Sequence, residues 1–128
     1  MKLTKKQKKI NKKERYMKTK AYAKKQLKKQ EKQKDKEWRI AIMEKFNYEC
    51  VICPERERIN AHHIIPRTFK ETRWDILNGV ALCSKHHKFG KFSAHKNPLW
   101  FFDHLKILGI YINETYLLNL LKQHENNI

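Results

Sequence analysis

Hydrophobic and polar residues are distributed very unevenly along this 128-residue chain. Residues 1–37 are almost entirely polar, contain no Gly or Pro, and carry apolar residues in a stripe too thin to bury against a core. Good helix formers, mainly Lys, Gln and Glu, dominate this stretch. We therefore expect residues 1–37 to form a tail that is disordered or weakly helical when free.

From Asp35 onward the pattern becomes that of an amphipathic helix. Trp38, Ala41, Ile42 and Phe46 recur at the i, i+3, i+4 and i+8 positions of one helix face. This spacing predicts a helix of about ten residues whose apolar face packs in the core. We expect the folded domain to begin here and to span residues 38–128.

A strand, a loop and a second strand are predicted next. Residues 56–61 favour a strand, and Pro66 ends it. The loop follows over 67–77, with Trp74 and Ile76 as its expected anchors. Residues 80–82, Val-Ala-Leu, are short, apolar and bounded by a turn signal, as a buried strand should be.

Helical patterns occupy the rest of the chain. Ser84 is the expected N-cap of a short helix that ends at Gly90. Asn97 and Pro98 then open a helix, because a capping residue followed by Pro is a helix start signal. The apolar face expected for this helix consists of Leu99, Phe102, Leu105 and Leu108. A last helix is predicted over 113–121, which gives a small α+β domain with β-β-α at its centre.

Charge is concentrated in the tail. Residues 1–37 hold sixteen Lys and one Arg against four acidic residues, a net of +13, so only +4 of the total +17 falls on residues 38–128. Such a basic segment predicts a nucleic acid or another polyanion as partner. No stretch is long and apolar enough to span a membrane, so we expect no membrane partner.

The cysteines and several histidines indicate a structural metal. Cys50 and Cys53 are spaced C-x2-C, and Cys83 and His86 repeat that spacing. Together they supply the four S/N ligands of a closed tetrahedral Zn²⁺ site. Three cysteines cannot all pair as disulfides, so a reducing cytoplasmic setting is expected.

Other polar residues in the same window suit a second, open metal site. His62, His63, Asn78 and His87 lie outside the zinc spacing and follow the order of an HNH motif. On these residues the segment resembles the HNH endonucleases, a family with a zinc-braced ββα-metal (His-Me finger) fold, here of phage or mobile-element type. The resemblance covers roughly residues 38–108. It implies a metal-dependent DNA endonuclease that hydrolyses phosphodiester bonds.

The resemblance also implies residue roles. His63 would be the general base, and Asn78 would position the base loop or help to hold the metal. His62 and His87 would bind the catalytic divalent ion, which is Mg²⁺, Mn²⁺, Ni²⁺ or Zn²⁺. The position one helical turn after His87, a His in some relatives, is Lys91 here.

His95 is an additional candidate ligand, although at eight residues past His87 it does not share that residue's helix face. Arg67, Arg73, Lys88 and Lys91 are candidate phosphate contacts.

Two readings from different classes remain open at this stage. A non-catalytic, zinc-stabilised DNA-binding module would share the basic tail and the zinc ligands. It would have no need of His63, Asn78 and His87. If the phage resemblance holds, packaging proteins in a host cell are candidate partners, while the oligomeric state and the target sequence are left open.

Overall fold

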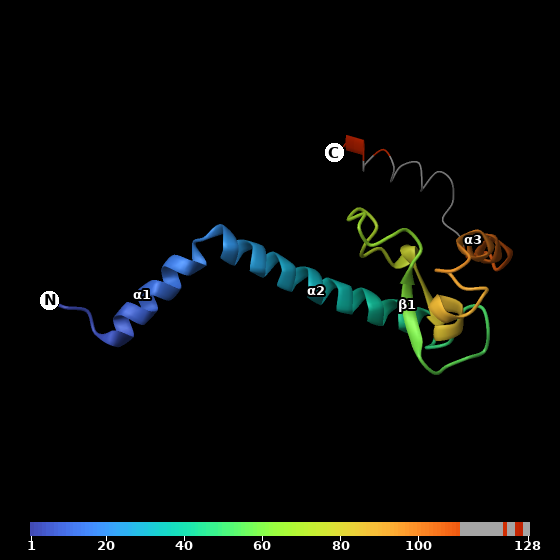
Figure 1. Cartoon of the computed structure of the whole chain (residues 1–128), viewed down its shortest axis with the longest axis horizontal. Coiled ribbons are helices and arrows are strands. Elements are labelled where there is room, and N and C mark those ends of the chain that lie inside the picture. Colours follow the sequence, from blue (N-terminus) through green and yellow to red (C-terminus); the bar gives the residue numbers. More distant parts are fainter. Residues whose placement is uncertain (111–121, 123–124, 127–128) are drawn as a thin grey trace. The chain divides into compact units, whose positions relative to one another are not determined.

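The computed structural model describes residues 1–110, 122, 125 and 126, and within them the expected α+β class is confirmed. Helices flank one small antiparallel sheet of two strands (Figure 1). The predicted helix over 113–121 lies outside the described residues. The elements in chain order are α1 (Lys5–Met17), α2 (Lys20–Lys45), β1 (Ile59–His63), η1 (Ile76–Asn78), β2 (Gly79–Cys83), η2 (Lys85–Phe89) and α3 (Pro98–Ile107).

The chain divides into two compact units, Met1–Lys34 and Asp35–Ile128. In the first unit Thr4 caps α1, since its hydroxyl accepts from Gln7 N at 3.2 Å and Gln7 Oε1 accepts from Thr4 N at 2.9 Å. No residue of α1 is buried. The tail that we expected to be disordered or weakly helical is thus helical in the structure, where capping and strong helix formers compensate for the missing core.

Helix α2 is longer than its apolar pattern indicated. It begins at Lys20, not near Asp35, because the residues between contain no Gly or Pro to end it. Its last eleven residues carry the expected core face, with Trp38 and Ile42 both buried. Among the described helices, none is long and apolar enough to cross a membrane.

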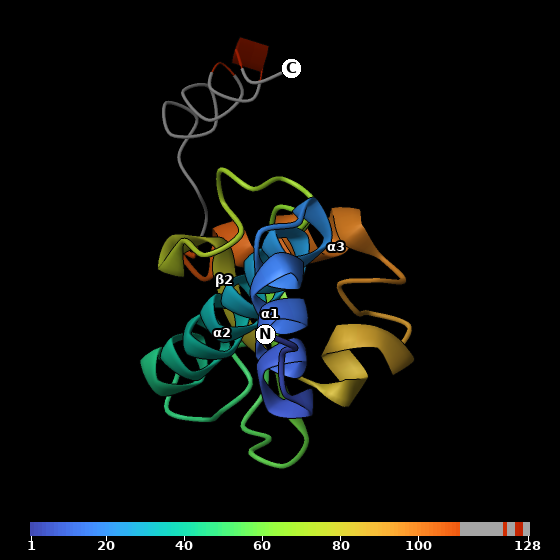
Figure 2. The same cartoon turned by 90° about the vertical axis from the view of Figure 1, so that its left-hand side faces the viewer.

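The two strands pair antiparallel in a register that runs from Ile59 opposite Cys83 to His63 opposite Gly79. Strand β1 lies later in the chain than the predicted 56–61, because Arg58 adopts a left-handed backbone with φ 53° and delays the start of the strand. His62 and His63 therefore lie within β1 and face opposite sides of the sheet. Every residue of β2, labelled in Figure 2, is buried.

Helix α2 packs directly against the start of β2. A Cβ on Gly79 would lie 2.6 Å from Ile42 Cδ1 and 2.6 Å from Trp38 Cζ2. Only glycine permits this approach. The rest of the core of this unit is formed by a cluster that includes Val80, Leu82, Phe101 and Leu105.

The two helical segments after β2 agree only partly with the predictions. Helix α3 begins as expected, with Asn97 Oδ1 accepting from Trp100 N at 3.3 Å. Its buried residues are Phe101 and Leu105, while Leu99 is 84% exposed, so the predicted apolar face was wrong by part of a turn. Ser84 makes no capping bond to η2, and its hydroxyl instead donates to Arg58 O at 3.4 Å.

Candidate zinc centre and active site

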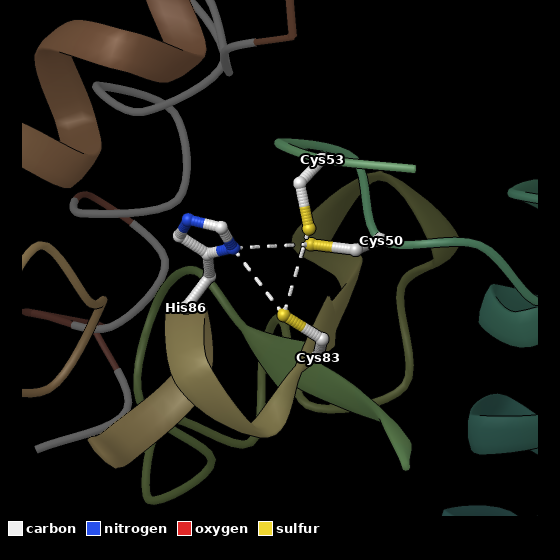
Figure 3. A group of neighbouring side chains, drawn as sticks. All are labelled: Cys50, Cys53, Cys83 and His86. Atoms are coloured by element: carbon white, nitrogen blue, oxygen red, sulfur yellow. Dashed lines mark hydrogen bonds between the residues drawn. The ribbon is translucent and has the colours of Figure 1, made fainter. Parts of the chain in front are cut away.

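Four side chains from two separate segments converge on one point (Figure 3). The two loop cysteines precede β1, while Cys83 ends β2 and His86 lies on η2. The distances are 3.8 Å between Cys53 Sγ and Cys83 Sγ, 3.3 Å from Cys83 Sγ to His86 Nδ1, and 3.7 Å from Cys50 Sγ to His86 Nδ1. A tetrahedral zinc site with ordinary bond lengths has edges of about 3.5 to 3.8 Å. The cluster is compatible with Zn²⁺.

The chemistry of these donors also fits a cation. Burial, with smaller contributions from the neighbouring Cys83 and Cys50 sulfurs, raises the pKa of the Cys53 thiol to about 11. The pKa of His86 is lowered by burial, and then by Lys85 and His104, so its imidazole stays neutral. Thiolates held this close together need a positive charge between them, which a Zn²⁺ ion would supply.

A second group brings together three histidines from three segments. These are His62 on β1, His87 on η2 and His95 in the loop before α3, and their ligand nitrogens all lie within 4.8 Å of one another. His95 Nε2 is 3.1 Å from His87 Nε2.

His95 reaches this group because the chain turns back on itself after η2. Helix η2 ends at Phe89, and the following segment returns beside it, with His95 N donating to His87 O at 3.1 Å. The mismatch of helix faces that counted against His95 therefore does not apply. Lys91 lies beyond the end of η2, so it is not one helical turn along the same helix.

Two of the three imidazoles, those of His62 and His87, are neutral at physiological pH. Burial lowers the pKa of His62 to about 3, with smaller contributions from His87 and His95. Burial likewise lowers the pKa of His87 to about 4, assisted by His95 and Lys88. Neutral imidazoles offer lone pairs, and a group of three converging histidines suits a transition ion.

His63 lies on the other face of β1 and has different partners. Its ring stacks on Trp38 with centroids 3.8 Å apart and an interplanar angle of 8°. His63 Nε2 lies 2.9 Å from Arg73 O. A carbonyl oxygen can only accept, so Nε2 carries the hydrogen and Nδ1 keeps its lone pair. Burial is the main cause that lowers the pKa of His63, so the ring is neutral at physiological pH.

Asn78 is completely buried at the end of the loop between the strands. Its Oδ1 accepts from Ile65 N at 2.6 Å, and its Nδ2 donates to Ile65 O and Thr72 O, each at 3.1 Å. All of its hydrogen bonds in the described structure go to the loop. This geometry supports the loop-positioning role rather than a role as metal ligand.

Comparison with known families adds to this geometry. Residues 50–93 match the family model of the HNH endonucleases. We refer to residues 50–93 as the HNH segment, after the family model that they match. No curated protein and no solved structure matches the chain. The match confirms the resemblance carried by the histidines and Asn78, and it supports a nuclease or nucleic-acid-binding function in general.

The HNH segment contributes to a cleft of about 780 Å³. The side chains that line this cleft include four histidines and two basic residues: His62, His63, His87, His95, Arg67 and Lys88. The Arg67 side chain is 65% exposed, and its guanidinium is 3.7 Å from Asp35 Oδ2. Lys91 is exposed, with its ammonium 5.8 Å from the centre of the Phe92 ring.

Arg73 differs from the other three candidate phosphate contacts. Its Nε and Nη2 donate to the two carboxylate oxygens of Asp35 at 2.9 and 2.7 Å, and its side chain is only 11% exposed. This pair gives Arg73 a structural role in the loop. Its contact with DNA stays a prediction.

The sequence did not point to two residues beside the HNH segment. Trp38 was expected only to fill the core, and no role was expected for Asp35. The available signal was their i, i+3 spacing on one helix face, followed by the paired Arg73 and Trp74 in the loop.

Proposed function

We propose that this protein is a metal-dependent DNA endonuclease. The observation that carries the proposal is the division of the histidines in the cleft. Three of them form a group of metal-ligand geometry, while His63 is held apart from that group and, within the described residues, hydrogen-bonds through Nε2 alone. The match of residues 50–93 to HNH endonucleases supports the same reaction class.

In this proposal His63 is the general base. Its Nε2–H is held by the Arg73 carbonyl, so Nδ1 is the atom that takes the proton from the attacking water. A lowered pKa keeps the ring neutral, and therefore able to accept that proton, at physiological pH. Asn78 holds the loop that carries Arg73.

The catalytic ion would be held by His62, His87 and His95, whose nitrogens converge. When bound, a divalent ion supplies Lewis-acid stabilisation of the phosphate and of the leaving 3′ oxygen. Three imidazoles favour Mn²⁺, Ni²⁺ or Zn²⁺ over Mg²⁺, which prefers oxygen ligands.

The remaining elements would bind and support the substrate. Arg67 and Lys88 line the cleft, and Lys91 follows Lys88 by three residues. These three side chains would neutralise phosphates near the scissile bond. The basic residues of 1–34 would add sequence-independent DNA affinity. Zn²⁺ on Cys50, Cys53, Cys83 and His86 would brace the fold, and the reducing cytoplasm would keep these thiols unoxidised.

A plasmid-cleavage assay tests the proposal. Purified protein with verified zinc content is incubated with supercoiled plasmid and Mg²⁺, Mn²⁺, Ni²⁺ or Zn²⁺ in separate reactions. We expect nicked or linear products with at least one transition ion and none with excess chelator. A folded, zinc-loaded protein that binds the plasmid but does not cut it, whichever ion is added, would instead be a zinc-stabilised DNA-binding module.

A further inference from the structure

The loop between the strands is held at several points around the carbonyl that binds His63. On one side of Arg73, the carbonyl of Thr72 accepts from Asn78 Nδ2 at 3.1 Å. On the other side, the carbonyl of Asp75 accepts from Trp38 Nε1 at 2.8 Å. The Arg73 carbonyl therefore lies in a short stretch of backbone whose flanking residues are fixed by two different elements.

Asp35 holds the same stretch of loop by accepting hydrogen bonds from the side chains of two of its residues. It forms the bidentate pair with Arg73, and its Oδ1 also accepts from Trp74 Nε1 at 2.9 Å. Bidentate pairs of this kind are among the strong, geometrically specific hydrogen bonds in proteins. The hydrogen bond from Arg73 is the largest of the causes that lower the pKa of Asp35, so the carboxylate stays ionised. One carboxylate on α2 thus fastens two consecutive loop residues.

Trp38 lies one helical turn after Asp35 and constrains the imidazole itself. The stacked indole fixes the plane of the His63 ring, while the Arg73 carbonyl fixes which nitrogen points towards the loop. A neutral histidine has two tautomers, and the one that is present depends on the partner of each nitrogen. The ring plane is therefore set by a contact from α2, and the tautomer is set by the carbonyl of a loop residue that Asp35 of α2 holds in place.

We propose that Asp35 and Trp38 are positioning residues for His63. They hold its ring in the Nε2–H tautomer and so leave Nδ1 as the proton acceptor. The catalytic consequence rests on the proposed endonuclease function, whereas the tautomer assignment does not. Loss of the Asp35 carboxylate would remove both bidentate hydrogen bonds of the Arg73 guanidinium, whose side chain is only 11% exposed, and this is costly enough to displace the loop and its carbonyl.

The test compares three full-length variants with wild type. Asp35→Asn removes the charge, and Asp35→Glu restores it with one extra methylene. Glu44→Gln is the matched control, because it makes the same charge change at an exposed position of the same helix. Two quantities are measured: cleavage kinetics over a range of DNA concentrations, which gives kcat and KM, and the His63 ring signals in long-range proton–nitrogen correlation spectra, assigned with His63→Ala.

We expect Asp35→Asn to lower kcat by about ten- to a hundredfold with KM and zinc content unchanged, because small displacements of a catalytic group cost that much. The His63 signals should change from the Nε2–H pattern to a mixture of tautomers. Asp35→Glu should recover part of both, and Glu44→Gln should match wild type. If Asp35→Asn does not fold, Arg73→Lys removes the same bidentate pair while keeping the charge.

An Asp35→Asn protein with wild-type kcat and an unchanged His63 spectrum would overturn the proposal. So would a wild-type spectrum showing the hydrogen on Nδ1. If wild type cuts no DNA under any ion, the endonuclease function fails, and the spectra still decide whether Asp35 sets the tautomer.

Discussion

Removal of the structural zinc should unfold residues beyond 35 while leaving the N-terminal unit unaffected. Two of the four ligands, Cys50 and Cys83, belong to the hydrophobic core cluster itself. The ion would join the end of β2 and helix η2 to the loop before β1, and without it these segments lose that link.

The magnitudes make this a large effect. Structural zinc in small modules contributes on the order of 10 kcal/mol, while whole domains are stable by only about 5–15 kcal/mol. The described core is small, with Phe101, Ile42, Leu82 and Leu105 as its largest fully buried apolar side chains. We therefore expect no cooperative folding of this unit once all the zinc has been removed.

Tryptophan fluorescence is a specific assay because all three tryptophans, Trp38, Trp74 and Trp100, lie in the second unit. Chelation should shift their emission to that of exposed indole, and stoichiometric Zn²⁺ should restore it. His86→Ala should lower the bound zinc, whereas His104→Ala, outside the four-residue cluster, should not. A native emission spectrum and an unchanged melting temperature after verified removal of all zinc would refute this reasoning.

Three further predictions concern the tail, a glycine and an ion pair. Deletion of residues 1–34 should flatten the salt dependence of DNA affinity by several units, at about 0.9 per phosphate contact, while cleavage at saturating DNA persists; an unchanged slope would show that the tail does not lie on DNA. Gly79→Ala should destabilise the protein by about 1–3 kcal/mol in urea denaturation, because its Cβ would overlap Trp38 and Ile42, and an unchanged midpoint would contradict that packing. Asp35 has a folded-state pKa below its ordinary 3.8, so its contribution to stability is present above that pH and is lost as the pH falls through the folded value. Asp35→Asn should remove this part of the acid destabilisation, and identical pH profiles for the two proteins would exclude it.

Spacing in the sequence predicted much of the site, since ligand spacing is a local property. The C-x2-C and C-x2-H pairs grouped four residues that the structure does bring together. The alternation of a strand correctly separated His62 from His63, because neighbouring strand residues face opposite sides whatever the rest of the fold does.

Other features depend on how distant segments meet, and the sequence did not reveal them. His95 joins His87 only because η2 ends after Phe89 and the chain returns beside it. The ion pair of Arg73 was not predicted because its partner, Asp35, is 38 residues earlier. The predicted buried face of α3 was partly wrong. This helix has more apolar residues than the two that are buried, Phe101 and Leu105, so periodicity alone could not show which of them would face the core.

The central claim is that His63 is the general base, and the single-turnover cleavage rate of His63→Ala tests it most directly. The rate is measured with saturating metal and DNA, after zinc content and helix content have been matched to wild type. We expect a loss of roughly a hundred- to ten-thousandfold that no metal concentration restores, because only the proton acceptor is gone. His87→Ala, which weakens the proposed metal site, should be inactive at low metal and partly rescued at high metal. A His63→Ala protein that cuts DNA at the wild-type rate would contradict the account.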